Sequence, residues 1–346
     1  MHDKLGWGII STGRIAGSFA RALATSRRGE LVAVASRTAQ AAEQFAATFK
    51  APRWHASYEA LLDDPAVQAV YIATPHPVHA EWAIRAAQAG KHILCEKPLT
   101  MNHAEAVDVI EAARRHDVFL MEAFMYRCHP QTHRLVELIR GGTIGEARVI
   151  QATFSFNAPY DPAGRIYANE LGGGGILDVG CYCASMARLI AGVAAGGDFA
   201  EPTDVAGFGQ VGPTGVDHHA VACLGFPGDI VANLATGVDV NMENVVRIFG
   251  SKGHVHVPTP WTPGTNGGTT RIHVHVEGKP HARTIPVQTD RWLFAIEADV
   301  VAENLDRRQA RPPAMTWDDT LGNMKTLDRW RAAVGVAYHC ERTGRA

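Results

Sequence analysis

The chain has 346 residues, of which 46% are hydrophobic and 20% are charged, and its formal net charge is −2. This length suits two domains with ample core, while the near-neutral charge gives no basic patch for nucleic acid. The six cysteines are scattered and include no C-x-x-C pair, which favours reduced thiols. The first residues carry no apolar signal region and no later window approaches a membrane span. We therefore expect a cytoplasmic protein without nucleic-acid or membrane partners.

The first stretch of the chain predicts a strand, a tight turn and a helix. The apolar run Leu5–Ile10 ends in a turn of small residues, and apolar side chains then recur at helical spacing. Gly13 lets the backbone come close to a pyrophosphate, and the free N–H groups of the first helical turn attract the anion. An ordinary buried βα unit remains the alternative, and Ser11 stands where the first glycine of G-x-G-x-x-G usually lies. The candidate cofactor contacts here are Ser11, Thr12, Gly13, Arg14 and Ile15.

A second apolar run, Glu30–Ala35, is followed by Ser36 and Arg37. In a Rossmann unit the residue at this point faces the adenine ribose, and a carboxylate here selects NAD. This chain has no carboxylate at that point. Arg37 offers a cationic fork suited to a phosphate, and Ser36 can donate a hydrogen bond. A solvated loop arginine is the plain alternative, but we expect a preference for NADP(H), with NAD(H) possible.

The next buried strand, Val67–Ala73, ends in a loop stiffened by two prolines, at the sheet edge where open α/β folds bind ligands. The candidate cofactor contacts in this loop are Thr74, Pro75, His76 and His79. No carboxylate or cysteine cluster accompanies the histidines, so we predict no metal site.

A further strand, His92–Cys95, stops at the tripeptide Glu96-Lys97-Pro98. A lysine at the carboxyl end of a central strand can hold a substrate hydroxyl and offset the charge of a developing alkoxide. A helix-capping surface lysine stays open as the alternative for the tripeptide alone. A helix over His103–His116 and a strand over Val118–Met121 then complete the αβ alternation.

Beyond Gly145 the pattern changes to strands of period two with few helices between them, which predicts an α+β domain with a large open, mostly antiparallel sheet. The predicted strands are Ala147–Asn157, Val205–Gly212, Asp217–Phe226, Ile230–Val238, Val245–Phe249 and Arg271–Glu277, and helices follow over Trp292–Arg307 and Trp317–Arg342. We divide the chain into an NAD(P)-binding Rossmann domain, residues 1–125, and a substrate-binding and dimerisation domain, residues 126–346, whose last helices pack back on the first. An open sheet face needs a partner, so we expect a homodimer or a dimer of dimers.

A glycine-rich segment, Leu171–Tyr182, is inserted in the second domain. Asp178 and Tyr182 are four residues apart and so lie on one face of a helix. An ammonium group such as Lys97 is expected to lower the pKa of the Tyr182 phenol, which makes this residue a candidate general acid and base. Asp178 would orient the substrate or the lysine, with helix capping as the alternative role.

Together these segments resemble the Gfo/Idh/MocA oxidoreductase family over essentially the full length, and within it the dihydrodiol and xylose dehydrogenase branch. The matching segments are residues 11–16, Ala73-Thr74-Pro75 with His79, Glu96-Lys97-Pro98, Glu122–Gln131 and Gly172–Tyr182. The resemblance implies a catalytic set of Lys97, Asp178 and Tyr182, with the tyrosine where many members carry histidine. It also implies that Arg127 and Arg165 lie near the nicotinamide or the substrate.

The resemblance and the residues favour an NADP(H)-preferring dehydrogenase or reductase that acts on a CH–OH group of a sugar or polyol. The substrate contacts it implies are Lys97, Arg165, Asp178 and Tyr182. Two alternatives remain: a redox-neutral, NAD-dependent enzyme of glycosidase type, and a non-enzymatic sugar or dinucleotide sensor. The presence of both Lys97 and Tyr182 disfavours the sensor.

Overall fold

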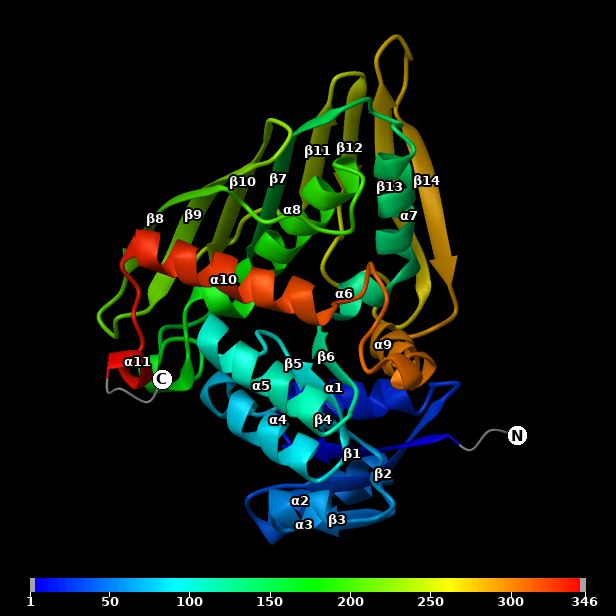
Figure 1. Cartoon of the computed structure of the whole chain (residues 1–346), viewed down its shortest axis with the longest axis vertical. Coiled ribbons are helices and arrows are strands. Elements are labelled where there is room, and N and C mark those ends of the chain that lie inside the picture. The colour runs from blue at the N-terminus through cyan, green and yellow to red at the C-terminus, as the bar shows by residue number, and fades with distance from the viewer. Residues whose placement is uncertain (1–3, 343–346) are drawn as a thin grey trace.

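The computed structural model describes residues 4–342 and shows two β-sheets with helices packed against them (Figure 1). The first sheet is parallel, with strand order β3-β2-β1-β4-β5-β6. β1 and β4 are buried along their whole length, which is why their sequences are continuous apolar runs. The strands are β1 (Leu5–Ile10), β2 (Gly29–Ala35), β3 (Arg53–His55), β4 (Ala69–Ile72), β5 (His92–Glu96) and β6 (Leu120–Ala123). The helices of this domain are α1 (Arg14–Leu23), α2 (Ala39–Phe49), α3 (Tyr58–Leu62), α4 (His79–Gln88) and α5 (His103–Arg115).

The second sheet has the strand order β14-β13-β12-β11-β7-β10-β9-β8. β7 and β10 pair in parallel, and the other neighbours in this order pair antiparallel. This confirms the prediction that the second domain contains a large, mostly antiparallel sheet. β14 has no predicted counterpart; it contains Pro286, which an edge strand tolerates because one of its sides makes no ladder bonds. The strands are β7 (Ala147–Ser155), β8 (Asp204–Val211), β9 (Asp217–Phe226), β10 (Ile230–Gly237), β11 (Val246–Gly250), β12 (Gly253–Val257), β13 (Gly268–Val276) and β14 (Arg283–Thr289).

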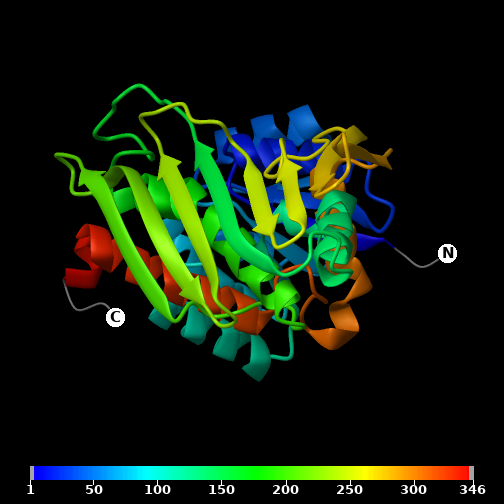
Figure 2. The same ribbon diagram turned by 90° about the horizontal axis from the view of Figure 1, so that it is seen from above.

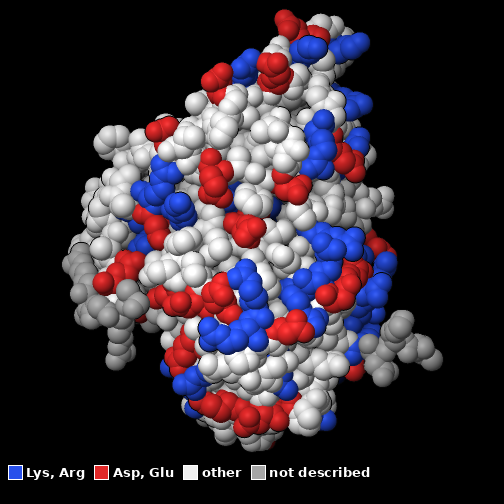
Figure 3. Space-filling view, viewed as in Figure 1, with Lys and Arg blue, Asp and Glu red and all other residues white. Residues whose placement is uncertain are grey.

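One face of the second sheet is covered by helices and the other face is open (Figure 2). On the covered face, α8 (Cys181–Ala194) packs against β7 and β10, and α7 (Pro130–Arg140) and α10 (Trp317–Val334) pack against α8. On the open face Phe208 is 80% exposed, Val231 50% and Val221 45%. Elsewhere on the molecule, Figure 3 shows basic and acidic side chains interspersed, which agrees with the small net charge.

The stretch Asn169–Ala194 contains an 18-residue window with a mean hydropathy of 1.5, which makes the stretch long and apolar enough to cross a membrane. The expectation that no window approaches a membrane span was therefore wrong. The apolar window is entirely buried inside the protein, where α8 lies between the second sheet and the other helices. Its hydropathy reflects this core position, because a helix packed on all sides is apolar all round.

The closing helices return to the Rossmann domain. α9 (Leu293–Glu303) packs against α1 and against α6 (Met125–Cys128), while α10 packs against α5. The predicted helix Trp317–Arg342 is interrupted: Gly335, at φ +85°, ends α10, and the separate turn α11 (His339–Arg342) follows. The remaining short elements are η1 (His76–Val78), η2 (Asn169–Leu171), the π-helix η3 (Ile176–Gly180) and η4 (Leu305–Arg307).

Candidate active site

A cavity of about 640 Å³ lies at the carboxyl ends of β1, β4 and β5, where they face the second domain. Loops that follow neighbouring parallel strands meet at one sheet edge, so residues far apart in the sequence converge here. The second domain closes the cavity with η3, the start of α8 and the segment after β7. The predicted site residues that line the cavity are Ser11, Gly13, Arg14, Ile15, Thr74, Pro75, His76, His79, Glu96, Lys97, Arg165, Asp178 and Tyr182.

The turn after β1 presents the start of α1 to this cavity. Gly13 is the N-cap residue of α1, no side chain caps that end, and its first turn contains no acidic residue. The first N–H groups of α1 are therefore available to an anion, which fits the pyrophosphate of a dinucleotide. Ser11 adopts φ +101°, a conformation that strains any residue except glycine, and this explains why the fingerprint usually has glycine there.

Thr12, Ser36 and Arg37 lie outside the cavity, at the neighbouring end of β2. The hydroxyl oxygens of Thr12 and Ser36 are 3.4 Å apart, so the turn after β1 and the end of β2 are adjacent. Arg37 is exposed and lies near Tyr58, whose pKa is raised by burial against the opposing charge of Arg37. This places a cation, and no carboxylate, directly after β2, where the fold holds the adenine ribose.

The Asp178 carboxylate lies between two cations. Lys97 Nζ donates to the Asp178 carbonyl oxygen at 2.7 Å and lies 3.4 Å from its Oδ1. Arg165 donates to both carboxylate oxygens at 3.2 Å. Burial opposes the ionisation of Asp178, but Lys97 and Arg165 hold its pKa well below the usual range. Burial likewise opposes the charge of Lys97, but Asp178, Cys181 and Glu96 together outweigh burial, so the pKa of Lys97 is raised.

The Tyr182 side chain lies in an aromatic cluster and its hydroxyl does not reach Lys97. Tyr182 Oη contacts Met125 Sδ at 3.5 Å, while Lys97 Nζ lies 5.1 Å from the centre of the ring, over its face. Phe124 and Phe154 pack edge-on against the ring, both at 5.1 Å between centroids. Burial, followed by the charge of nearby groups such as Glu96, raises the pKa of Tyr182 well above its ordinary value. The predicted lowering of this pKa was therefore wrong, since burial outweighs an ammonium whose charge Asp178 already shares.

The two histidines fix the loops that carry the site. His79 lies with Nδ1 3.0 Å from the Pro98 carbonyl oxygen and Nε2 2.9 Å from that of Thr74, so it joins the loops after β4 and β5. His76 Nδ1 lies 3.0 Å from the carbonyl oxygen of Gly172, and burial lowers the pKa of His76 to about 3. His76 is thus neutral at physiological pH and donates from Nδ1.

Both carboxyl oxygens of Glu96, the residue before Lys97, accept hydrogen bonds. Tyr71 Oη donates to Glu96 Oε1, and the Lys97 amide donates to Oε2 at 3.3 Å. Burial raises the pKa of Glu96. Within residues 4–342, no group of three or more His, Cys, Asp or Glu side chains could hold a metal ion.

Arg127 does not belong to this cavity. Its guanidinium is 1% exposed and pairs with Asp319 of α10 at 2.5 Å, with further bonds to Ser185 and to the Pro313 carbonyl oxygen. Asp319 is shared with the buried Arg188. Arg127 therefore ties α6 to α8 and α10, and its predicted contact with the cofactor is corrected to a structural role.

The apolar wall of the cavity was predicted only in part. Met125 lies in the segment Glu122–Gln131, which the sequence offered either as core or as a wall over the nicotinamide, whereas Phe154, Phe156, Ile166 and Val179 were not predicted. Phe154 and Phe156 are two residues apart at the end of β7, a spacing that puts both on one face of a strand and could have drawn attention to them.

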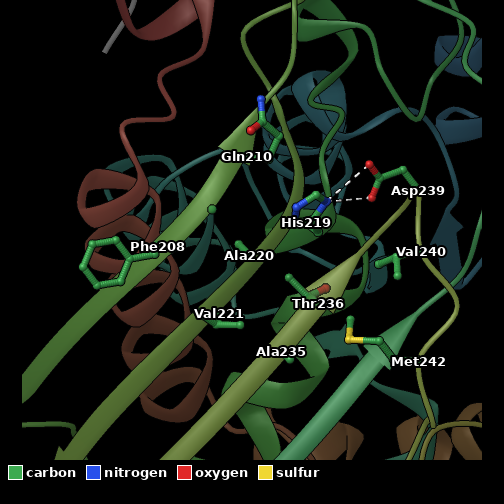
Figure 4. A pocket seen from close by; sticks show the side chains of 11 residues that line it. Phe208, Gln210, His219, Ala220, Val221, Ala235, Thr236, Asp239, Val240 and Met242 are labelled. Atoms are coloured by element: carbon green, nitrogen blue, oxygen red, sulfur yellow. Dashed lines mark hydrogen bonds and ion pairs between the residues drawn. The ribbon is translucent and has the colours of Figure 1, made fainter.

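A second cavity of about 690 Å³ lies on the open face of the second sheet, over β8, β9 and β10 (Figure 4). Its lining is largely apolar, including Phe208, Val221 and Met242. The ion pair of His219 with Asp239, 3.0 Å between Nδ1 and Oδ1, lies at its edge.

The uncapped helix start, the doubly wound sheet and the buried lysine–aspartate pair define a dinucleotide-dependent oxidoreductase. Comparison with known families agrees: the model of the oxidoreductase family with an NAD-binding Rossmann fold matches residues 5–124, and that of the GFO/IDH/MocA C-terminal domain matches residues 132–256. The chain belongs to the Gfo/Idh/MocA family and is an NAD(P)-dependent oxidoreductase.

Similar proteins of known name cover nearly the whole chain. Trans-1,2-dihydrobenzene-1,2-diol dehydrogenase from Homo sapiens is 35% identical over 342 residues, covering 96% of this chain and 98% of the relative. The Mus musculus enzyme of that name is 33% identical over 339 residues, with the same coverage of both chains. The crystal structure of KijD10, a 3-ketoreductase from Actinomadura kijaniata in complex with NADP and TDP-benzene, matches with a TM-score of 0.84 at 27% identity, over 96% of this chain and 98% of that one. Aldose-aldose oxidoreductase from Caulobacter crescentus matches with a TM-score of 0.83 at 26% identity and the same coverage.

Proposed function

We propose that this protein is an NADP(H)-preferring dehydrogenase or reductase that interconverts a CH–OH group and a ketone on a sugar, polyol or cyclic diol. The observation that carries this proposal is the convergence of Lys97, Asp178 and Tyr182 on the cavity that the start of α1 faces. The names of the similar proteins, which include diol dehydrogenases, a 3-ketoreductase and an aldose oxidoreductase, support the same substrate class.

The residues of the site divide the work as follows. When bound, the nicotinamide supplies or accepts the hydride. Lys97 donates to the substrate oxygen and offsets its charge as the alkoxide forms. Tyr182 gives its proton to that oxygen during reduction and takes it back during oxidation. Asp178 keeps Lys97 charged, and Arg165 offers donors to a neighbouring hydroxyl.

Replacement of Tyr182 by phenylalanine tests this assignment. The variant keeps the ring in its aromatic cluster and removes the proton, so kcat for reduction should fall about 10²–10⁴-fold while cofactor affinity changes little. Tyr126→Phe is the matched control, because it removes the same group from a neighbouring ring. The Tyr126 hydroxyl is hydrogen-bonded to Ser185 Oγ at 2.9 Å. A near wild-type kcat for Tyr182→Phe would refute the role. If no sugar, polyol or dihydrodiol supports turnover of the wild type, the sensor becomes the better hypothesis.

The preference for NADP(H) rests on Ser36 and Arg37. A charge-assisted contact with the 2′-phosphate contributes about 1.5–3 kcal/mol, so Arg37→Ala should weaken NADPH binding roughly 10- to 150-fold. NADH binding should change little, and fluorescence titration of both cofactors measures the difference. Equal losses for the two cofactors, or a wild-type preference for NADH, would contradict this preference.

The assembly that we propose is a homodimer, or a dimer of dimers, joined through the open face of the second sheet. The exposed Phe208, Val221 and Val231 and the cavity among β8–β10 support it, since large apolar patches mark interfaces. Light scattering should report a dimer or tetramer for the wild type and a smaller species for Phe208→Glu; a wild-type monomer at micromolar concentration would refute the proposal.

We also propose a cytoplasmic location, which the buried free thiols Cys95, Cys128, Cys181 and Cys183 support.

A further inference from the structure

The glycine-rich turn that precedes Asp178 is hydrogen-bonded to a segment far away in the sequence. Residues 169–175 include Gly172 at φ +68° and Gly174 at φ +105°. Glycine is the most flexible residue in an unfolded chain, so a turn of this composition has little conformational preference of its own. Its geometry has to come from the elements packed around it. In Figure 1 the C-terminal turn α11 lies beside this segment, and η2 and α11 are in contact.

The C-terminal segment, residues 336–341, is hydrogen-bonded to this turn at several points, including the pair His339 Nδ1 and Glu170 Oε1, 3.2 Å apart. Tyr338 Oη donates to the Gly173 carbonyl oxygen at 2.6 Å. Asn169 Oδ1 accepts from the His339 amide at 2.8 Å, and Asn169 Nδ2 donates to the Ala337 carbonyl oxygen at 3.2 Å. Tyr338 and Asn169 are both buried, which makes the loss of either partner costly.

α10 anchors the segment in turn. Arg331 of α10 donates to Glu341 at 2.8 and 3.0 Å and lies 5.0 Å from the centre of the Tyr338 ring, over its face. Glu341 also accepts from the Tyr338 amide at 3.0 Å. The Tyr338 hydroxyl is therefore presented to the turn by a buried, charge-assisted cluster rather than by a free chain end.

The turn is itself hydrogen-bonded to Asp178, whose carboxylate we place in the catalytic set. The Asp178 amide donates to the Gly174 carbonyl oxygen at 3.2 Å, inside the first turn of η3. Asp217 of β9 accepts from the Ile176 amide at 2.8 Å and also fixes the start of η3. A shift of Gly173 would thus move η3, and with it the Asp178 contact to Lys97.

We propose that the C-terminal segment 336–341 is part of the catalytic apparatus, with Tyr338 as a positioning residue that sets Asp178 against Lys97 through the glycine-rich turn. This inference rests on the proposed roles of Asp178 and Lys97 in hydride transfer. Tyr338 touches neither residue in catalysis; it acts by fixing the Gly173 carbonyl.

The test is Tyr338→Phe, which keeps the ring over Arg331 and removes one hydrogen bond. Leaving a buried carbonyl unsatisfied changes an equilibrium roughly 5- to 150-fold. We expect hydrogen exchange at the Ile176 and Asp178 amides to accelerate within that range. We also expect kcat to fall with the NADPH KM unchanged, and the alkaline limb of kcat to move to lower pH, because a displaced Asp178 no longer supports the charge of Lys97.

Thr326→Val is the matched control. Thr326 is buried in α10, and its hydroxyl donates to the Gly322 carbonyl oxygen at 2.8 Å, so the variant removes the same type of bond within the helix. It should lower the melting temperature but leave kcat and the exchange of Ile176 and Asp178 unchanged. In an Asp178→Asn background, Tyr338→Phe should have little further effect on kcat, since both changes act through one carboxylate.

Unchanged exchange at Ile176 and Asp178 in Tyr338→Phe would overturn the inference, and so would full additivity with Asp178→Asn. A protein that turns over no sugar or diol would refute the proposed function instead. In that case the exchange experiment still decides whether the C-terminal segment fixes the turn.

Discussion

Asp178→Asn is the change whose effect follows most directly from the geometry. The carboxylate is 6% exposed and is the shared partner of Lys97 and Arg165. Removing one partner of a buried ion pair costs about 3–5 kcal/mol. Arg165 keeps 43% of its side chain exposed and is screened by water, so the loss falls at the lower end of that range, about 3 kcal/mol. If this loss is felt in the transition state, kcat falls roughly 10²-fold.

The assay is kcat and KM as a function of pH, with cofactor affinity measured separately. Asp178 raises the pKa of Lys97 against the opposing effect of burial. In the asparagine variant the effect of burial on Lys97 is offset less, so Lys97 should lose its proton at lower pH and the alkaline limb of kcat should move down. Cofactor affinity should stay near that of the wild type, because no contact of the turn after β1 changes.

The same variant makes a prediction for stability. The pKa of Asp178 is depressed in the folded protein, so its contribution to stability is complete above the unfolded value of about 4 and is lost as the pH falls through the folded value. The wild type should therefore be more stable than Asp178→Asn at pH 7, and the difference should shrink in acid. A variant with wild-type kcat at every pH, or with equal stability at pH 7, would refute the role of this carboxylate.

Three further changes separate structural from functional residues. Ser11→Gly should raise the melting temperature, because it relieves a positive φ that costs a non-glycine residue about 1 kcal/mol; an unchanged or lower melting temperature would count against the strain. Glu297→Leu should stabilise the protein by about 1–3 kcal/mol, since neither carboxyl oxygen has a hydrogen-bond partner among residues 4–342. Burial raises the pKa of Glu297, so wild-type stability is lost as the pH rises above the unfolded value, and urea unfolding should show a larger gain at pH 8 than at pH 5. Arg127→Gln should cost about 3–5 kcal/mol of unfolding free energy and leave NADPH affinity unchanged; a weaker affinity at full stability would return Arg127 to the cofactor site.

Much of the site could be predicted because it is encoded locally. The turn after β1, the loop carrying Thr74 and the tripeptide carrying Lys97 each follow a buried apolar strand, and the parallel order of those strands brings the three loops together. The geometry of a Rossmann sheet thus converts three separate sequence patterns into one cavity.

The features that sequence reasoning missed depend on contacts between distant residues. Arg127 lies in a motif next to the site, but its guanidinium points to Asp319, a residue of α10 that only the tertiary structure brings near. The hydrogen bond from Tyr338 to Gly173 likewise joins positions 165 residues apart. β14 escaped prediction because Pro286 is unfavourable in a central strand, and the sequence does not show that this strand lies at an edge.

The wrong sign of the Tyr182 pKa has a consequence for the chemistry. The sequence places a lysine and a tyrosine in one site, but the sign of the shift depends on how deeply the phenol is buried and on whether the ammonium faces its oxygen or its ring. Here the ring is buried, Lys97 lies over its face, and Asp178 shares the positive charge. The phenol therefore keeps its proton at neutral pH. A group in that state can donate to a ketone oxygen without prior ionisation, whereas oxidation of an alcohol needs the proton removed first. We therefore expect kcat for oxidation to rise with pH more steeply than kcat for reduction, which initial rates in both directions would measure.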